Sequence, residues 1–151
     1  MRNKNYYFAY GSNLNEKQMK ERCPDSKLLG VAVLKNYRLD FTIYSSRWNC
    51  GCADVLKDDG KEVWGLLYTL SEEDLQKLDK FEGNPDFYRR IQVDVIDKMG
   101  KSIKSYTYDV VNKSPFQMPS SKYLNIIKGA SMRFNFSKNY QDFLEKIEFI
   151  S

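Results

Sequence analysis

The chain has 151 residues, a formal net charge of +4 and no histidine. This length is enough for one domain, which we expect to span residues 1–151 and to fold on its own core without a disulfide or a metal. The lack of histidine excludes Ser-His-Asp and Cys-His catalysis and every His-ligated metal site. Carboxylates, lysines, tyrosines, cysteines and main-chain groups remain as candidates for chemistry.

Charge and hydropathy also exclude several partners. Lys and Arg are interspersed with Asp and Glu along most of the chain, whereas nucleic-acid binding requires a concentrated positive face. No apolar run approaches the roughly 18 residues that cross a bilayer. Residues 11–13, Gly-Ser-Asn, interrupt the N-terminal segment before a secretory apolar region forms. We therefore expect a cytoplasmic protein that binds neither nucleic acid nor membrane.

The N-terminal segment predicts a strand, a tight turn and a helix. Residues 5–10 are rich in aromatic side chains, and Gly11 ends them. Asn13 then offers a helix N-cap with the Glu16 carboxylate three residues later, and Pro24 limits the helix that follows.

The middle of the chain predicts a sheet. Extended segments with near-alternate apolar residues are expected at residues 28–45, 52–56, 62–70, 88–97 and 103–111. The first is broken at Lys35-Asn36, where a bend or hairpin is expected, and turns are expected at residues 58–60 and at Met99-Gly100. Strands linked in this way build a mostly antiparallel sheet.

Three further helices are expected after the N-terminal one. Ser71 begins a capping-box-like segment that runs to Phe81 and ends at Gly83, and two more helices are expected at residues 122–132 and 140–147. Few helices among many hairpin-linked strands indicate an α+β domain. The pattern leaves open whether the sheet closes into a barrel.

Three cysteines, Cys23, Cys50 and Cys52, are too few for a disulfide framework. The Cys-Gly-Cys spacing at 50–52 places two thiols on one face of a strand, which suits neither a disulfide nor a zinc site. We expect buried or half-buried free thiols and no bound metal.

Glu82 is the residue that stands out for catalysis. On a helical projection it falls between Leu75 and Leu78, on the face that enters the core, and it lies in the last turn, where the helix dipole does not stabilise an anion. Both effects predict a raised pKa, which suits a group that takes and returns a proton near neutral pH. The alternative is a frayed end with Glu82 in water or paired with Arg89 or Arg90.

The turn at residues 10–14, Tyr-Gly-Ser-Asn-Leu, leads from a strand into a helix start. Free N–H groups at such a start form a place for a carboxylate or a developing oxyanion. The same residues also suit a turn with a cap and no ligand. Both interpretations stay open from the pattern alone.

Four segments, in this order and spacing, resemble the γ-glutamylcyclotransferase family: Tyr-Phe-Ala-Tyr-Gly-Ser-Asn-Leu at 7–14, Tyr-Arg-Leu-Asp-Phe at 37–41, Glu-Val-Trp-Gly-Leu-Leu-Tyr at 62–68 and Leu-Asp-Lys-Phe-Glu-Gly at 78–83. The resemblance continues through Tyr123 and Lys-Gly-Ala at 128–130. It implies a small, mostly antiparallel β-barrel with helices packed around it. It also implies an enzyme without cofactor or metal that acts on a small-molecule γ-glutamyl substrate.

By this resemblance, a γ-glutamyl amino acid or γ-glutamylamine is converted to 5-oxoproline and a free amino acid or amine. Glu82 is the implied general acid/base, and the implied substrate-binding residues are Tyr7, Phe8, Ala9, Tyr10, Gly11, Ser12, Asn13 and Tyr123. A non-catalytic module that binds a small carboxylate or a peptide end, and an RNA- or protein-binding adaptor, are the alternative functions. A homodimer stays open beside the monomer.

Overall fold

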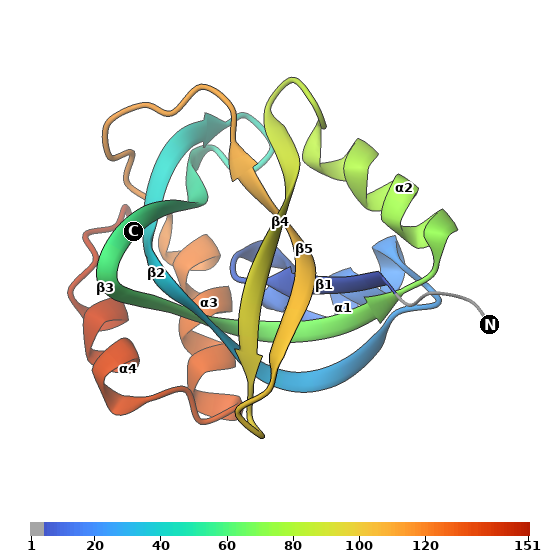
Figure 1. Cartoon of the computed structure of the whole chain (residues 1–151). Helices are drawn as coiled ribbons and strands as arrows, with labels where there is room; N and C mark the ends of the chain where they lie inside the picture. Colours follow the sequence, from blue (N-terminus) through green and yellow to red (C-terminus); the bar gives the residue numbers. More distant parts are fainter. Residues whose placement is uncertain (1–4) are drawn as a thin grey trace.

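Figure 1 shows a computed structural model that describes residues 5–151 as a closed barrel of five strands with helices outside it. The strands are β1 (Asn5–Ala9), β2 (Lys27–Ser45), β3 (Cys50–Leu70), β4 (Tyr88–Asp97) and β5 (Ser102–Val110). The helices are a short 3₁₀ helix, η1 (Ser12–Leu14), and α1 (Glu16–Arg22), α2 (Glu72–Glu82), α3 (Ser121–Arg133) and α4 (Lys138–Glu145). The predicted α+β barrel is confirmed.

The strand order β1-β3-β2-β4-β5 closes the barrel. β1 runs antiparallel to β3, with Tyr7 opposite Tyr68. β2 meets β4 where Val33 lies opposite Ile96, and β4 pairs with β5 as an antiparallel hairpin. Closure comes from the parallel pairing of Tyr7 in β1 with Tyr106 in β5. The sheet is therefore mostly antiparallel, as predicted, and β1 has a neighbour on both sides.

β2 and β3 form a long, bent ribbon. The pairing register shifts between Lys35 and Tyr37, where Asn36 has a φ of 66° and its side-chain oxygen accepts a hydrogen bond from the Gly60 N–H at 3.1 Å. The bend expected at Asn36 is confirmed. The turn expected at residues 58–60 is wrong as a break between two strands, because β3 runs through them. Residues 58–61 have no paired partner in β2 and form a bulge opposite Asn36, with Gly60 at a φ of 86°.

The start of α1 differs from the prediction. Its N-cap is Asn15, whose side chain accepts a hydrogen bond from the Gln18 N–H, and not Asn13. Asn13 is unavailable as a cap because its amide points to Tyr7 and Glu82. The helix itself ends before Pro24, as expected.

Local signals define both ends of α2. The Ser71 hydroxyl caps the helix by accepting from the Asp74 N–H at 3.1 Å. Leu75 and Leu78 are buried in the core. The helix ends at Gly83, whose φ of +69° is a left-handed conformation that glycine adopts without strain. Glu82 is thereby the last residue of α2.

Helices cover the barrel on separate sides. Figure 1 shows α3 and α4 next to each other, while α2 lies across the barrel from them, near the blue N-terminal segment. The two predicted C-terminal helices are confirmed with shifted ends. The three cysteines are free and buried, as expected. Among residues 5–151, no helix is both long and apolar enough to span a bilayer.

Candidate active site

A cavity of about 390 Å³ opens at the end of β1. This volume is at the lower end of the range for sites that hold small molecules. Its walls come from the β1–η1 turn, the end of β2 with the β2–β3 turn, the ends of α1 and α2, and single stretches of β3, β4, β5 and α3. The lining includes Tyr7, Tyr10, Gly11, Ser12, Asn13, Arg22, Tyr44, Arg47, Trp48, Cys52, Lys80, Glu82, Tyr88, Tyr108 and Tyr123.

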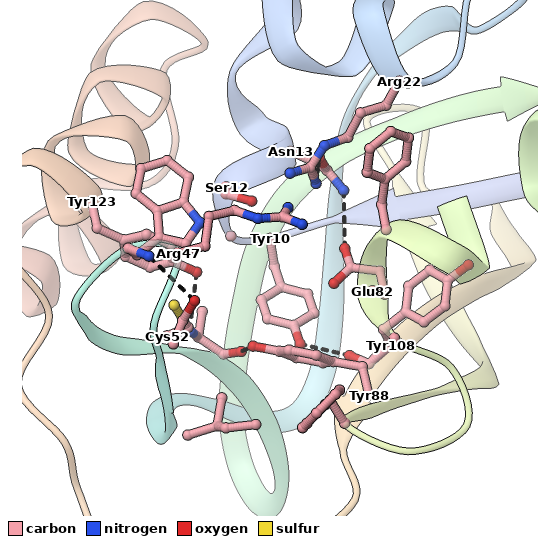
Figure 2. A pocket seen from close by; sticks show the side chains of 18 of the residues that line it. Tyr10, Ser12, Asn13, Arg22, Arg47, Cys52, Glu82, Tyr88, Tyr108 and Tyr123 are labelled. Atoms are coloured by element: carbon pink, nitrogen blue, oxygen red, sulfur yellow. Dashed lines mark hydrogen bonds between the residues drawn. The ribbon is translucent and has the colours of Figure 1, made fainter. Parts of the chain in front are cut away.

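Glu82 faces this cavity. Figure 2 shows its carboxyl group opposite Asn13, and the Asn13 side-chain N–H donates to it at 3.2 Å. Burial raises the pKa of Glu82 to about 7, while the charges of Arg22 and Arg47 and the Asn13 hydrogen bond lower it in part. The residue as a whole is half-buried because its carboxyl end lines an open cavity. The predicted rise in pKa is thus present, with desolvation as its main cause.

Asn13 is held in one orientation. Its side-chain oxygen accepts hydrogen bonds from Gln18 Nε2 at 3.0 Å and from Arg22 Nη1 at 3.1 Å. Because both acceptor positions are used, the amide nitrogen faces the other way, toward Tyr7 Oη at 2.9 Å and Glu82. Asn13 is nearly fully buried. This network fixes the distance between the β1–η1 turn and the Glu82 carboxyl.

The β1–η1 turn presents its backbone to the cavity. Ser12 begins η1, and the first N–H groups of such a helix have no partner within it. A Cβ at Gly11 would lie 3.2 Å from Ala53 Cβ and 3.2 Å from Tyr123 Oη. Glycine therefore allows the turn to approach β3 and α3 closely at this point.

Four tyrosines frame the base of the cavity. The Ala53 N–H donates to Tyr123 Oη at 3.0 Å, and the Tyr88 hydroxyl donates to the Ala53 carbonyl at 2.7 Å. The Tyr10 hydroxyl donates to the Tyr108 carbonyl at 2.6 Å. Burial, together with nearby charges, raises the pKa of each of these four phenols well above its ordinary value. All four are neutral hydrogen-bonding groups at physiological pH.

The cavity thiol is a poor nucleophile. Cys52 lines the wall, and burial raises its pKa to about 12. At neutral pH it is therefore a protonated thiol and not the reactive thiolate. Within residues 5–151, no cluster of three or more carboxylates or thiols is arranged to hold a metal ion.

Most residues singled out in the sequence meet at this cavity. Its walls include Tyr7, Tyr10, Gly11, Ser12, Asn13, Glu82 and Tyr123. Phe8 and Ala9 do not line it, because both are fully buried in the core. Pairing of Glu82 with Arg89 or Arg90 is not seen, because Arg89 pairs with Asp109 at 2.8 Å and Arg90 with Asp79 at 3.5 Å.

Other cavity residues had no recognised signal in the sequence. Arg22, Arg47, Trp48, Tyr88 and Tyr108 reach the site from four separate segments. A carboxyl group with a near-neutral pKa, set across a small-molecule cavity from fixed hydrogen-bond donors, is typical of an enzyme that moves protons on a small substrate.

Comparisons with known proteins identify the family. The model of the family described as "Gamma-glutamyl cyclotransferase, AIG2-like" matches residues 7–126. The γ-glutamylcyclotransferases of Mus musculus and Homo sapiens are 32% and 33% identical over 147 residues, which covers 94% of this chain and 78% of each relative. The chain belongs to the γ-glutamyl cyclotransferase, AIG2-like family, and the prediction of an enzyme of this type is confirmed.

The fold agrees with this membership. A solved structure of a γ-glutamyl cyclotransferase matches with a TM-score of 0.90 and 32% sequence identity, over 97% of this chain and 89% of that chain. YkqA of Bacillus subtilis matches with a TM-score of 0.78 at 28% identity, over 98% of this chain and 56% of that chain. The second comparison indicates that the same barrel also occurs within a longer protein.

Proposed function

We propose that the protein converts a γ-glutamyl amino acid or γ-glutamylamine into 5-oxoproline and a free amino acid or amine, with Glu82 as general acid/base. The observation that carries this proposal is the Glu82 carboxyl, with a pKa of about 7, facing the β1–η1 turn across the cavity. Family membership supplies the reaction class, and the cavity supplies a group suited to its proton transfers.

The bond changes require no nucleophile from the protein. The α-amine of the substrate attacks its own γ-carbonyl carbon, the new C–N bond closes a five-membered ring, and the original amide C–N bond breaks. Holding the chain of the substrate in a bent conformation brings these atoms together. Neither histidine nor an ionised thiol is used, in keeping with the sequence and with the protonated state of Cys52.

Proton balance defines the work of Glu82. At neutral pH the substrate α-ammonium loses two protons as it becomes the lactam N–H, and the amide nitrogen gains two as it departs as an ammonium. Glu82 takes the two protons one after the other from the first nitrogen and passes each to the second. A carboxyl group with a pKa near 7 both accepts and releases protons at this pH. The Asn13 N–H steadies the carboxylate between the two transfers.

The remaining site residues bind the substrate in this proposal. The N–H groups of Gly11, Ser12 and Asn13 hold the α-carboxylate of the glutamyl group or the carbonyl oxygen as it gains negative charge. The neutral side chains of Tyr10 and Tyr123 form the cavity wall beside these N–H groups.

The direct test is product formation. We expect 5-oxoproline when the purified protein is incubated with γ-glutamyl-alanine and a panel of related γ-glutamyl compounds, measured by liquid chromatography and mass spectrometry. No 5-oxoproline from any member of the panel would contradict the proposal. Calorimetric binding of a γ-glutamyl compound that stays uncut would instead identify a binding module on this fold.

Activity is expected to depend on pH through Glu82. A general base must be ionised, so kcat/KM should rise about tenfold per pH unit below pH 7 and level off above it. This range follows from the raised pKa of about 7, whereas a solvated glutamate would give a plateau from about pH 5. The measurement is kcat/KM for γ-glutamyl-alanine from pH 5 to pH 8 at constant ionic strength. A flat profile would show that Glu82 is not the titrating base.

A further inference from the structure

The β2–β3 turn places a cation on the cavity wall opposite α2. The turn is fixed at its base, since the Asn49 N–H donates to the Ser45 carbonyl at 2.7 Å. The Trp48 ring packs edge-to-face on Tyr123, with centroids 5.1 Å apart. Arg47 lies between these two anchors and lines the cavity. Its backbone position is therefore set by contacts that do not involve its own charge.

Arg47 has no ion-pair partner in the site. The ion pairs of residues 5–151 include no carboxylate partner for Arg47. Arg22, the other arginine of the cavity, bonds to Asn13 and lies over the Phe81 ring, 4.9 Å from its centroid. Figure 2 shows the Arg47 side chain extended over the cavity from the side of Tyr123 toward the side of Glu82. Its guanidinium group is free to bind an anion from the ligand.

The proposed reaction, on which this inference rests, leaves one anion without a partner. A γ-glutamyl amino acid carries two carboxylates, one on the glutamyl group and one on the leaving amino acid, whereas a γ-glutamylamine carries only the first. If the N–H groups of the β1–η1 turn hold the glutamyl end, the leaving group extends toward the wall formed by Tyr44, Arg47 and Trp48. A planar guanidinium fork suits a carboxylate at that end.

We propose that Arg47 binds the carboxylate of the leaving amino acid and thereby makes the enzyme select γ-glutamyl amino acids over γ-glutamylamines. Arg47 acts as a specificity-determining residue that touches the departing part of the substrate. It takes no proton and forms no bond to the reacting carbon.

A matched substrate pair isolates this contact. Ethylamine is alanine without its carboxylate, so γ-glutamyl-alanine and γ-glutamyl-ethylamine differ only in the group that Arg47 is proposed to bind. Wild-type protein is expected to show the higher kcat/KM for γ-glutamyl-alanine. In Arg47→Met the preference for γ-glutamyl-alanine should fall roughly 10-fold. The expected change is modest because Arg47 is exposed and solvent screens its charge. Arg47→Lys should keep part of the preference, because lysine carries the same charge without the planar fork.

The ratio of the two kcat/KM values is the readout because Arg47 also affects Glu82. Its charge lowers the pKa of Glu82 in part, so its removal changes the rate with both substrates. That shared change cancels in the ratio. As a control, Arg133→Met removes an equal charge from α3, where Arg133 pairs with Glu16 outside the cavity, and should leave the ratio within about twofold of wild type.

An unchanged ratio in Arg47→Met would overturn the assignment of Arg47, whether the two rates stay the same or fall equally. If the ratio then falls in Lys80→Met, the carboxylate contact belongs to the lysine on the opposite wall. In both cases wild-type protein still releases 5-oxoproline, so the proposed function stands. No 5-oxoproline from either compound would overturn the proposed function and this inference together.

Discussion

Glu82→Gln is expected to lower kcat for γ-glutamyl-alanine by about 100-fold or more while the fold is kept. Glutamine has the size of glutamate and its side-chain oxygen can still accept the hydrogen bond that Asn13 donates. It cannot take up or return a proton near pH 7, so both proton transfers lose their carrier. The measurement is steady-state release of 5-oxoproline at saturating substrate, with far-ultraviolet circular dichroism to show that the barrel is intact.

Glu82→Gln is also expected to increase the stability of the fold at pH 8, although it lowers activity. The folded-state pKa of Glu82, about 7, is higher than its ordinary value of 4.5, so the folded protein binds this proton more tightly than the unfolded chain. The resulting stabilisation is complete below pH 4.5 and is lost as the pH rises to 7. At pH 8 the ionised carboxylate therefore destabilises the fold by up to about 3 kcal/mol, which the neutral glutamine avoids.

Thermal unfolding at two pH values checks this sign. The melting temperature of Glu82→Gln should exceed that of wild type at pH 8 and approach it at pH 5. Glu73→Gln is the matched control, since Glu73 lies exposed in the first turn of the same helix, outside the cavity, and should keep its activity. Unchanged turnover in Glu82→Gln would remove Glu82 from the mechanism. An unchanged melting temperature at pH 8 would show that Glu82 is solvated, and a lower one would show that its ionised form stabilises the fold.

The sequence predicted Glu82 because the signal is local. Helical periodicity relates Glu82 to Leu75 and Leu78 within two turns, and Ser71 and Gly83 mark the ends of α2 without reference to the rest of the chain. Strand positions followed in the same way from alternate apolar residues. Barrel closure did not, because it depends on the pairing of Tyr7 with Tyr106, almost a hundred residues away in the chain.

The errors share one physical cause, which is the replacement of a local preference by a tertiary contact. Asn13 suits an N-cap, but its amide joins β1, α1 and α2 through hydrogen bonds, and Asn15 caps the helix instead. The Asp-Asp-Gly sequence at 58–60 suits a turn, but β2 and β3 pair on both sides of it, so these residues form a bulge within one long strand. Arg47 and Tyr108 reach the cavity only once the barrel is formed, so no periodicity in their own segments points to them.

Asp54 is a buried carboxylate that the sequence did not reveal, and Asp54→Ala is expected to destabilise the fold by about 3–5 kcal/mol. Its side chain is completely buried, and it accepts hydrogen bonds from Thr42 Oγ1 at 2.8 Å, the Val110 N–H at 2.9 Å and Lys113 Nζ at 2.9 Å. Alanine leaves the first two donors buried without these acceptors and removes the partner of the Lys113 ammonium. Urea denaturation of both proteins at pH 7 measures the difference in the free energy of unfolding.

Asp40→Ala provides the matched control, because Asp40 lies directly opposite Asp54 in the β2–β3 register. The Asp40 side chain is 23% exposed and pairs with Arg38 at 3.4 Å, so its loss should change the free energy of unfolding by about 1 kcal/mol or less. Equal effects of the two variants would show that the Asp54 network adds nothing beyond a surface ion pair.

The Asp54 network also affects the active-site cavity, since the adjacent Ala53 accepts a hydrogen bond from Tyr88 through its carbonyl and donates one to Tyr123 through its N–H. Asp54→Ala protein that remains folded should therefore show a higher KM for γ-glutamyl-alanine than wild type. The reason is that the strand carrying Ala53 is no longer held in place, so Tyr88 and Tyr123 are less well positioned.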